Sequence, residues 1–275
     1  PRRPRPPFHR ESVNLTSSPP MSDSMRFRHD GSTDSILAAL AAALRAGSAA
    51  VLLAPDSSPS LFADDAVRIP ADPAAASQLL ARVSRELGKD WVRRLFRLLC
   101  SEEPDAENVA CRVLALAFER GADVMGYQAD PWIRKAGDIE RRVGGEIHRL
   151  KGLLRFRRLA DGRLWGPVEP RHNVIVLLAP HFRRRLGGER WLIHDAARGF
   201  GIGAELGGPA RPWTGLEIEE ALRGGLDGSE AEYSRFWQTY FQSIAIRNRS
   251  NPEAQRRNMP VRYWKHLIES PGRET

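Results

Sequence analysis

The spacing of apolar residues changes near residue 152, and this change restricts the chain to folds that combine helices with a sheet. From Asp34 to Lys151, most apolar side chains recur every three or four residues, as in amphipathic helices. From Leu153 to Arg158, apolar and charged residues alternate, as in a strand with two different faces. The sequence therefore predicts an α+β fold in which a helical N-terminal part packs on a small antiparallel sheet and aromatic-rich helices close the C-terminus.

The N-terminal part, residues 29–140, is expected to be mainly helical. Asp34 is a candidate N-cap for the first helix, and Gly47 ends it. Two short apolar runs predict strands, and three further helices are predicted after them. The strands span residues 50–54 and 66–70, and the helices span 73–87, 89–101 and 107–120. Residues 1–28 are rich in Pro, Arg and Ser and are expected to form a disordered tail.

Residues 141–275 are expected to form a basic α+β core, although 29–270 can also be one continuous domain. A helix that starts at Asp138 should end at Gly152. A β-hairpin over residues 153–168 should follow, with its turn at Asp161-Gly162.

The chain after this hairpin is expected to alternate between helices and a strand. Asn173 is the predicted cap of a helix, and residues 190–194 have the pattern of a strand. A long helix is predicted to start with a capping box of Ser229 and Glu232, and Asn251-Pro252 should break the chain and restart a helix. The long helix carries an apolar stripe of Tyr233, Phe236, Trp237, Tyr240, Phe241 and Ile244.

The net charge of +8 comes from the C-terminal half of the chain. Residues 29–140 carry 12 basic and 17 acidic residues, whereas residues 141–275 carry 24 and 15. Only four of the 42 basic residues are Lys, and Arg is the side chain that forks onto phosphate and stacks on bases. An anionic partner, with DNA as the first candidate, is therefore predicted. The alternative is an ordinary solvated surface in an Arg-rich composition.

Two groups of cations are candidate DNA contacts. The first spans a helix end and the following strand, where several side chains can face one phosphate backbone. This group is Arg149, Lys151, Arg155 and Arg157. The second interleaves guanidinium groups with aromatic rings, which suits phosphates and bases, although at least one ring is expected to be a core anchor instead. This group is Arg247, Arg249, Arg256, Arg257, Arg262, Tyr263 and Trp264.

Four acid–base side chains are candidates for catalysis, provided that they converge in one cleft. They are Glu146, His148, His181 and Asp195. The apolar face around His181 is typical of a core histidine, and Asp195 with Arg198 favours a structural ion pair over a catalytic pair. Arg198 is also a candidate for DNA contact. The spacing of these residues fits no compact metal motif, and Cys100 and Cys111 form no CxxC pair. No metal or other cofactor is predicted.

A membrane location is not predicted. The longest apolar run, over residues 35–55, is interrupted by Arg45 and is too weak for a bilayer span. The basic start of the chain is not followed by the apolar segment of a secretory signal. A cytoplasmic protein is expected.

The sequence resembles a bacterial family of DNA metabolism and DNA repair proteins that contains a domain of unknown function. The resemblance covers nearly everything from Asp30 to Glu269. It is carried by Asp30-Gly31, residues 146–156, His181-Phe182, residues 191–195 with Arg198, and residues 241–264. Members of this family are encoded beside a radical SAM protein of DNA modification or repair, and similar domains occur fused to uracil-DNA glycosylase-like domains. The resemblance implies a DNA-processing context and partners of these two kinds, but it supplies no established catalytic residues.

Three functions are consistent with these observations. A DNA-binding accessory protein in repair or base modification, acting with a separate radical SAM enzyme, requires salt-sensitive DNA affinity. A hydrolase or lyase of damaged nucleotides or DNA requires the four acid–base side chains to share a pocket. A protein-interaction partner requires complex formation without DNA affinity. The DNA-binding accessory protein is the preferred hypothesis.

Overall fold

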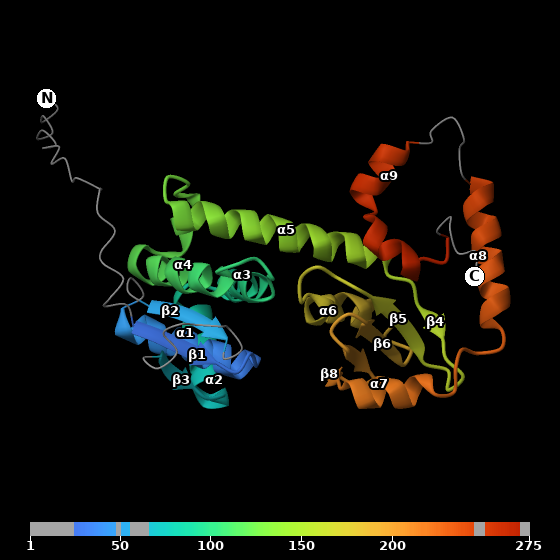
Figure 1. Ribbon diagram of the computed structural model, residues 1–275, viewed down its shortest axis with the longest axis horizontal. Coiled ribbons are helices and arrows are strands. Elements are labelled where there is room, and N and C mark those ends of the chain that lie inside the picture. The colour runs from blue at the N-terminus through green and yellow to red at the C-terminus, as the bar shows by residue number, and fades with distance from the viewer. Residues whose placement is uncertain (1–24, 48–50, 56–65, 245–250, 270–275) are drawn as a thin grey trace, which may run out of the picture.

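The computed structural model describes residues 25–47, 51–55, 66–244 and 251–269, which form two lobes connected by one long helix (Figure 1). The N-terminal lobe combines helices with a three-stranded sheet, and the C-terminal lobe combines helices with a five-stranded sheet. The predicted α+β class is confirmed. Among the described residues, no helix is long and apolar enough to cross a membrane.

The sheet of the N-terminal lobe is parallel, and its middle strand, β1 (Met25–His29), includes residues that the sequence places in a tail. Helix α1 (Thr33–Ala46) connects β1 to β2 (Val51–Pro55), and β3 (Ala66–Ile69) pairs with the other edge of β1. Strands β2 and β3 confirm the two predicted strands. The tail prediction is wrong for residues 25–28, because alternate side chains of β1 are buried in the lobe.

The remaining helices of the N-terminal lobe follow the predicted pattern. They are α2 (Pro73–Glu86), α3 (Lys89–Leu99) and α4 (Ala106–Arg120), followed by the short helix η4 (Ala122–Gly126). The carboxylate of Asp72 caps α2 by accepting hydrogen bonds from the backbone N–H groups of Ala74 and Ala75. The apolar faces of these helices bury one continuous core that extends into the C-terminal lobe.

Helix α5 (Pro131–Leu153) runs from the N-terminal lobe to the C-terminal lobe (Figure 1). It starts at Pro131, after the Asp130 cap and seven residues before the predicted start at Asp138, and it continues through Gly152, the predicted stop. Each internal glycine costs a helix about 1 kcal/mol relative to alanine. A continuous apolar stripe that is buried against both lobes offsets this cost. The stripe is Ile133, Ala136, Ile139, Val143, Ile147 and Leu150.

The sheet of the C-terminal lobe has the order β4-β5-β6-β7-β8. Its strands are β4 (Arg157–Arg158), β5 (Leu164–Val168), β6 (Trp191–Asp195), β7 (Phe200–Ala204) and β8 (Ala210–Trp213). The predicted turn at Asp161-Gly162 is present, although β4 is shorter than predicted. β5 and β6 are parallel because α6 (Ile175–Arg185) lies between them in the chain, so the sheet is mixed rather than antiparallel. Asn173 does not cap α6, whose N-cap is Val174.

The C-terminal helices are α7 (Gly215–Leu222), α8 (Glu230–Ile244) and α9 (Pro252–Asn258), followed by the short helix η6 (Val261–His266). Asn251 caps α9 through the backbone N–H of Ala254, which confirms the predicted restart. The prediction of a capping box at the start of α8 is wrong, because the hydroxyl of Ser229 donates to Asp227 instead. Figure 1 shows α8 at the outer edge of the C-terminal lobe, beside β4.

Candidate nucleic-acid interface

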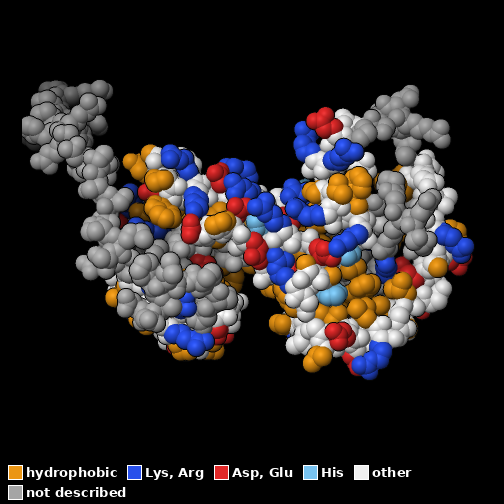
Figure 2. Space-filling view, in the orientation of Figure 1, with side chains coloured by type: hydrophobic (Ala, Val, Ile, Leu, Met, Phe, Trp, Pro, Cys, Tyr) orange, Lys and Arg blue, Asp and Glu red, His pale blue; other side chains and the backbone are white. Residues whose placement is uncertain are grey.

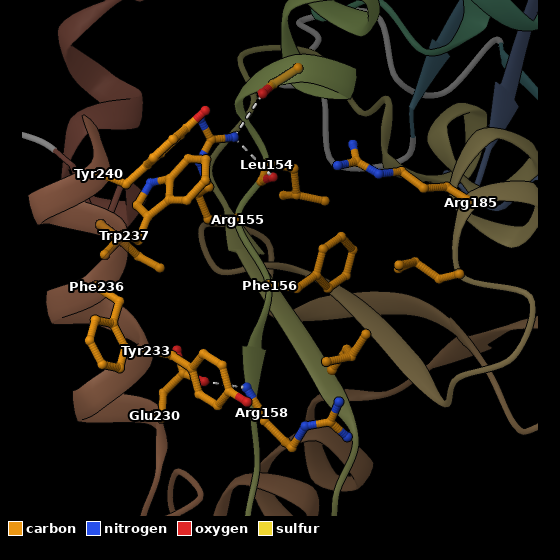
Figure 3. Close-up of a pocket in the computed structure, with 14 residues that line it drawn as sticks. Leu154, Arg155, Phe156, Arg158, Arg185, Glu230, Tyr233, Phe236, Trp237 and Tyr240 are labelled. Atoms are coloured by element: carbon orange, nitrogen blue, oxygen red, sulfur yellow. Dashed lines mark hydrogen bonds between the residues drawn. The ribbon is translucent and has the colours of Figure 1, made fainter. Parts of the chain in front are cut away.

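A groove of about 890 Å³ lies between α8 and the segment that contains β4; we call it the α8 groove. Aromatic rings of α8 point into it from one side, and residues of the β4 segment and the end of α6 form the other side (Figure 3). The ring wall consists of Tyr233, Phe236, Trp237 and Tyr240. The opposite wall includes Leu154, Arg155, Phe156, Arg158, Leu164 and Arg185.

The apolar stripe of α8 is exposed rather than buried. Its five outermost side chains, the four rings and Ile244, are between 38% and 66% exposed. Contiguous exposed apolar surface of this kind marks binding sites on soluble proteins. A helix packed in the core has the same spacing of apolar residues, so the sequence pattern alone does not distinguish the two situations.

Two carboxylates hold α8 beside the body of the protein. Glu230, at the start of the helix, accepts a hydrogen bond of 2.9 Å from the backbone N–H of Arg158. Glu269 accepts from the indole N–H of Trp237 at 3.0 Å and pairs with the guanidinium of Arg155. Burial acts to raise the pKa of Glu269, but these hydrogen bonds lower it below its usual value. Hydrogen bonds to these two carboxylates therefore fix α8, the outer wall of the groove, at its start and near its middle.

Arg155 and Arg158 form hydrogen bonds and ion pairs within the protein, whereas Arg185 forms none with the described residues. Arg155 is paired with Glu269, and Arg158 donates to the carbonyl of Gly162 and lies 3.7 Å from a carboxylate oxygen of Glu189. Arg185 is exposed and has no hydrogen bond or ion pair to the described part of the chain. It is the side chain through which the groove can bind an anion.

Arg185 continues into a cationic patch at the end of α6, which we define as Lys151, Arg183, Arg184 and Arg185. The three arginines are consecutive and exposed in the last turn of the helix. Burial is the main cause that lowers the pKa of His181, and the charges of Lys151, Arg185 and Arg184 lower it further. These cations from α5 and α6 are therefore close enough in space to act on one imidazole.

Some of the other predicted cations are exposed, and others are partly buried. Arg256 and Arg257 are exposed on α9, and no described residue forms a hydrogen bond or ion pair with either. Figure 2 shows Lys and Arg side chains gathered along α5 and around α9. Arg149 and Arg157 are partly buried, and the Nε of Arg149 is enclosed without a partner among the described atoms. Arg247 and Arg249 lie outside the described residues.

Glu146 is a buried structural carboxylate. Its side chain is 1% exposed and accepts hydrogen bonds from the backbone N–H groups of Arg171 and His172, at 2.8 and 2.9 Å. The hydroxyl of Tyr263 also donates to it, and the guanidinium of Arg262 lies 3.5 Å away. Burial and the hydrogen bond to Glu146 raise the pKa of Tyr263 to about 12.

Of the two rings in the second cation group, Tyr263 is buried and Trp264 is partly buried. Tyr263 is 2% exposed, as expected for one of the two rings, and Trp264 donates its indole N–H to the carbonyl of Met259. Arg262 lies over the ring of Tyr263 at 5.0 Å and faces Glu146. Arg262 and Tyr263 hold η6 against α5 through Glu146, and the burial of Tyr263 disfavours base stacking by this ring.

Asp195 and Arg198 form the predicted structural ion pair, with 2.8 Å between the guanidinium and the carboxylate. The fully buried carboxylate also accepts from the backbone N–H groups of Ala197 and Arg198. The same guanidinium reaches Glu102 and the carbonyls of Pro170 and Arg171, so its donors are engaged within the protein. A DNA contact by Arg198 is therefore disfavoured.

The four acid–base candidates do not form one cleft. Glu146 and Asp195 are connected only through other residues. The backbone N–H of Arg171 donates to Glu146, and the carbonyl of Arg171 accepts from Arg198, which pairs with Asp195. His148 is exposed on α5, and His181 packs edge-on against the ring of Phe182. No described residues form a cluster of three or more His, Cys, Asp or Glu side chains that can hold a metal.

The pH dependence of stability should reflect His172, which is 2% exposed and accepts a hydrogen bond from the N–H of Glu102 through Nδ1. Burial lowers its pKa. The unfolded state therefore takes up a proton first as the pH falls below about 6.5, and the free energy of unfolding should decrease from there downward. Urea unfolding between pH 7.5 and 5 should show this loss, and His172→Gln should reduce its slope. His148→Gln is the exposed control, and an unchanged slope in His172→Gln would contradict the prediction.

The fold is α+β, and the α8 groove combines exposed aromatic rings with an exposed arginine. The chain belongs to the family described as domain of unknown function DUF4130, whose model matches residues 104–269. This range covers more than half of the chain and includes α5, the five-stranded sheet and both walls of the α8 groove. None of the curated proteins matches the chain.

Proposed function

We propose that this protein is a DNA-binding accessory protein in DNA repair or base modification, and that it acts with a separate radical SAM enzyme. The observation that carries the proposal is the cationic patch at the end of α6. Three consecutive arginines are exposed in the last turn of α6, two of them act with Lys151 on the same imidazole, and no described residue pairs with any of these four cations. Like charges gathered at one helix end repel each other, and a bound polyanion relieves the repulsion.

The helix dipole alone does not account for the patch. One cation in the last turn is enough to interact favourably with a helix C-terminus, and each contributes about 0.3–1 kcal/mol at an exposed position. Guanidinium groups bind phosphate oxygens in pairs of parallel hydrogen bonds, so adjacent exposed arginines suit successive phosphates of a backbone. Arg256 and Arg257 on α9 add a second exposed pair.

DNA is the proposed polyanion because of the resemblance to proteins of DNA metabolism and repair. The same resemblance supports the radical SAM enzyme as the partner and a uracil-DNA glycosylase-like protein as a further one. We do not propose catalysis by this chain, because Glu146 and Asp195 are both occupied by backbone and side-chain donors.

Replacing Arg183, Arg184 and Arg185 together with Gln should weaken DNA affinity by about tenfold or more at moderate salt. Each phosphate contact contributes about −0.9 to the slope of log affinity against log salt concentration, so the slope should become shallower by about two to three. Fluorescence anisotropy of a labelled DNA duplex and a labelled single strand across a salt series measures both quantities.

The control for this prediction is the triple variant Arg93→Gln, Arg97→Gln and Arg120→Gln, which removes the same charge from exposed positions of the N-terminal lobe. It should leave the salt slope unchanged. An equal loss in both variants would assign the effect to net charge alone. The absence of any DNA binding by the wild-type protein at low salt would overturn the proposed function.

A further inference from the structure

We propose that the α8 groove is a binding site for single-stranded DNA, in which unpaired bases stack on the rings of α8 and the backbone leads to the cationic patch. This inference rests on the proposed function and specifies which form of DNA its site accepts. It is carried by two features of the same groove: one wall of exposed rings and an unpaired arginine on the other.

The rings are arranged so that bases can reach their faces. Tyr233, Phe236 and Tyr240 are 66%, 63% and 54% exposed, so most of each ring is open to a ligand. Trp237 is more enclosed, because its N–H is bound to Glu269 and the guanidinium of Arg155 lies 5.6 Å from its ring centre. Trp237 therefore anchors the wall, and the other three rings are available for stacking.

The dimensions of the ring wall match a short stretch of single strand. Tyr233 and Tyr240 are seven residues apart on α8, which corresponds to about 10 Å along a helix that rises about 1.5 Å per residue. A stacked strand advances about 3.4 Å per nucleotide, so this length corresponds to about three nucleotides. Three open rings therefore face about three bases.

The charges favour an anionic strand over an apolar helix of a partner protein. Arg185 lies in the groove wall and belongs to the cationic patch, so a strand whose bases occupy the groove can pass its phosphates to Arg184 and Lys151. An apolar protein helix would cover the rings but would leave Arg185 without a counter-charge. Rings combined with unpaired arginines are the arrangement by which proteins hold single strands.

Duplex DNA does not offer what the ring wall needs. In a duplex each base face is covered by the next base pair, and only base edges are accessible in the grooves. Aromatic stacking requires an open base face, which single strands provide and duplexes do not. Duplex DNA can still contact the cationic patch through its phosphates.

The test compares single variants Tyr233→Leu, Phe236→Leu and Tyr240→Leu with wild-type full-length protein. The probes are a labelled 12-mer of thymidine and a labelled duplex of the same length, measured by anisotropy at one low salt concentration. Each substitution should weaken single-strand affinity by about tenfold, because stacking of one base contributes about fivefold to a hundredfold in affinity, and should change duplex affinity by less than about twofold. Tyr127→Leu, at an exposed tyrosine outside the groove, is the matched control and should change neither.

The outcomes separate this inference from the proposed function. If the ring variants bind the thymidine 12-mer as wild type does, the inference is overturned, while duplex binding that depends on the cationic patch leaves the proposed function standing. If neither probe binds, both fail. If sedimentation shows that wild type is a dimer and that Phe236→Leu dissociates it without changing single-strand affinity, the groove is an interface between copies and the inference is also overturned. A competition assay on wild type needs no variant: unlabelled 12-mer and unlabelled duplex are each used to displace the labelled 12-mer. Displacement at a lower concentration of duplex than of 12-mer would reject the proposal.

Discussion

Replacing Glu146 with Ala should lower the free energy of unfolding by about 3–5 kcal/mol. The carboxylate is 1% exposed and accepts from two backbone N–H groups and the hydroxyl of Tyr263. Removing it leaves these buried donors without a partner, and each unmade hydrogen bond costs about 1–3 kcal/mol. Urea unfolding of the purified variant measures the change.

Two further variants identify the source of this loss. Tyr263→Phe removes one donor and keeps the ring, so it should cost about 1–2 kcal/mol. Glu119→Ala removes an exposed carboxylate from α4 and should change stability by no more than about 0.5 kcal/mol. A loss below about 1 kcal/mol in Glu146→Ala, together with weaker DNA binding, would assign the carboxylate to function rather than to the fold.

The second large effect is expected for Asp195→Ala, which should cost about 3–4 kcal/mol. The carboxylate is fully buried, and its removal leaves the guanidinium of Arg198 and two backbone N–H groups without their acceptor. These bonds close the turn between β6 and β7, so the loss should also loosen the pairing of these two strands beside the turn. Hydrogen exchange of the β6 and β7 amides measures this local effect.

The chain contains a matched control for this buried pair. Asp138 and Arg141 form the same pairing of Asp with Arg three residues later, at 2.9 Å, but on the surface of α5. Asp138→Ala should cost at most about 1 kcal/mol, because exposed ion pairs contribute little. Equal losses in the two variants would mean that burial does not determine the strength of the Asp195 pair.

The helices of the N-terminal lobe were predictable because their signals are local. In α2, the Asp72 cap and the apolar spacing of the 14 residues that follow it both favour a helix. Strand β1 was missed because Arg26 and Arg28 alternate with its apolar residues and because it directly follows a Pro- and Arg-rich sequence. Its central position depends on pairing with β2 and β3, which are separated from it in sequence.

Strands β7 and β8 were missed because their sequences, FGIGA and ARPW, contain residues that disfavour strands. The structure shows why glycine is needed there. A Cβ at Gly203 would lie 2.6 Å from the carbonyl oxygen of Trp191, and one at Gly201 would lie 2.9 Å from that of Ile193. This close approach of β7 to β6 is a long-range contact that no local pattern encodes.

For the candidate site, the sequence predicted cationic contacts in the C-terminal half but did not show which of these side chains are paired within the protein. Arg155 and Arg262 were candidates by charge alone, and both face buried carboxylates, Glu269 and Glu146, from distant parts of the chain. Arg185 was missed as a contact, although the run Arg183–Arg185 at a helix end was a visible signal. The rings of α8 were visible as a stripe, but their exposure was not.

The sequence by itself determined the α+β class, most helix positions, and the excess of arginine in the C-terminal half. These properties follow from local periodicity, caps and composition, which act within a few residues of each other. The tertiary structure alone decided which charges are neutralised and which rings remain open. Burial and ion pairing depend on residues more than a hundred positions apart, as between Arg155 and Glu269 or Glu146 and Tyr263, and such pairings arise only when the chain has folded.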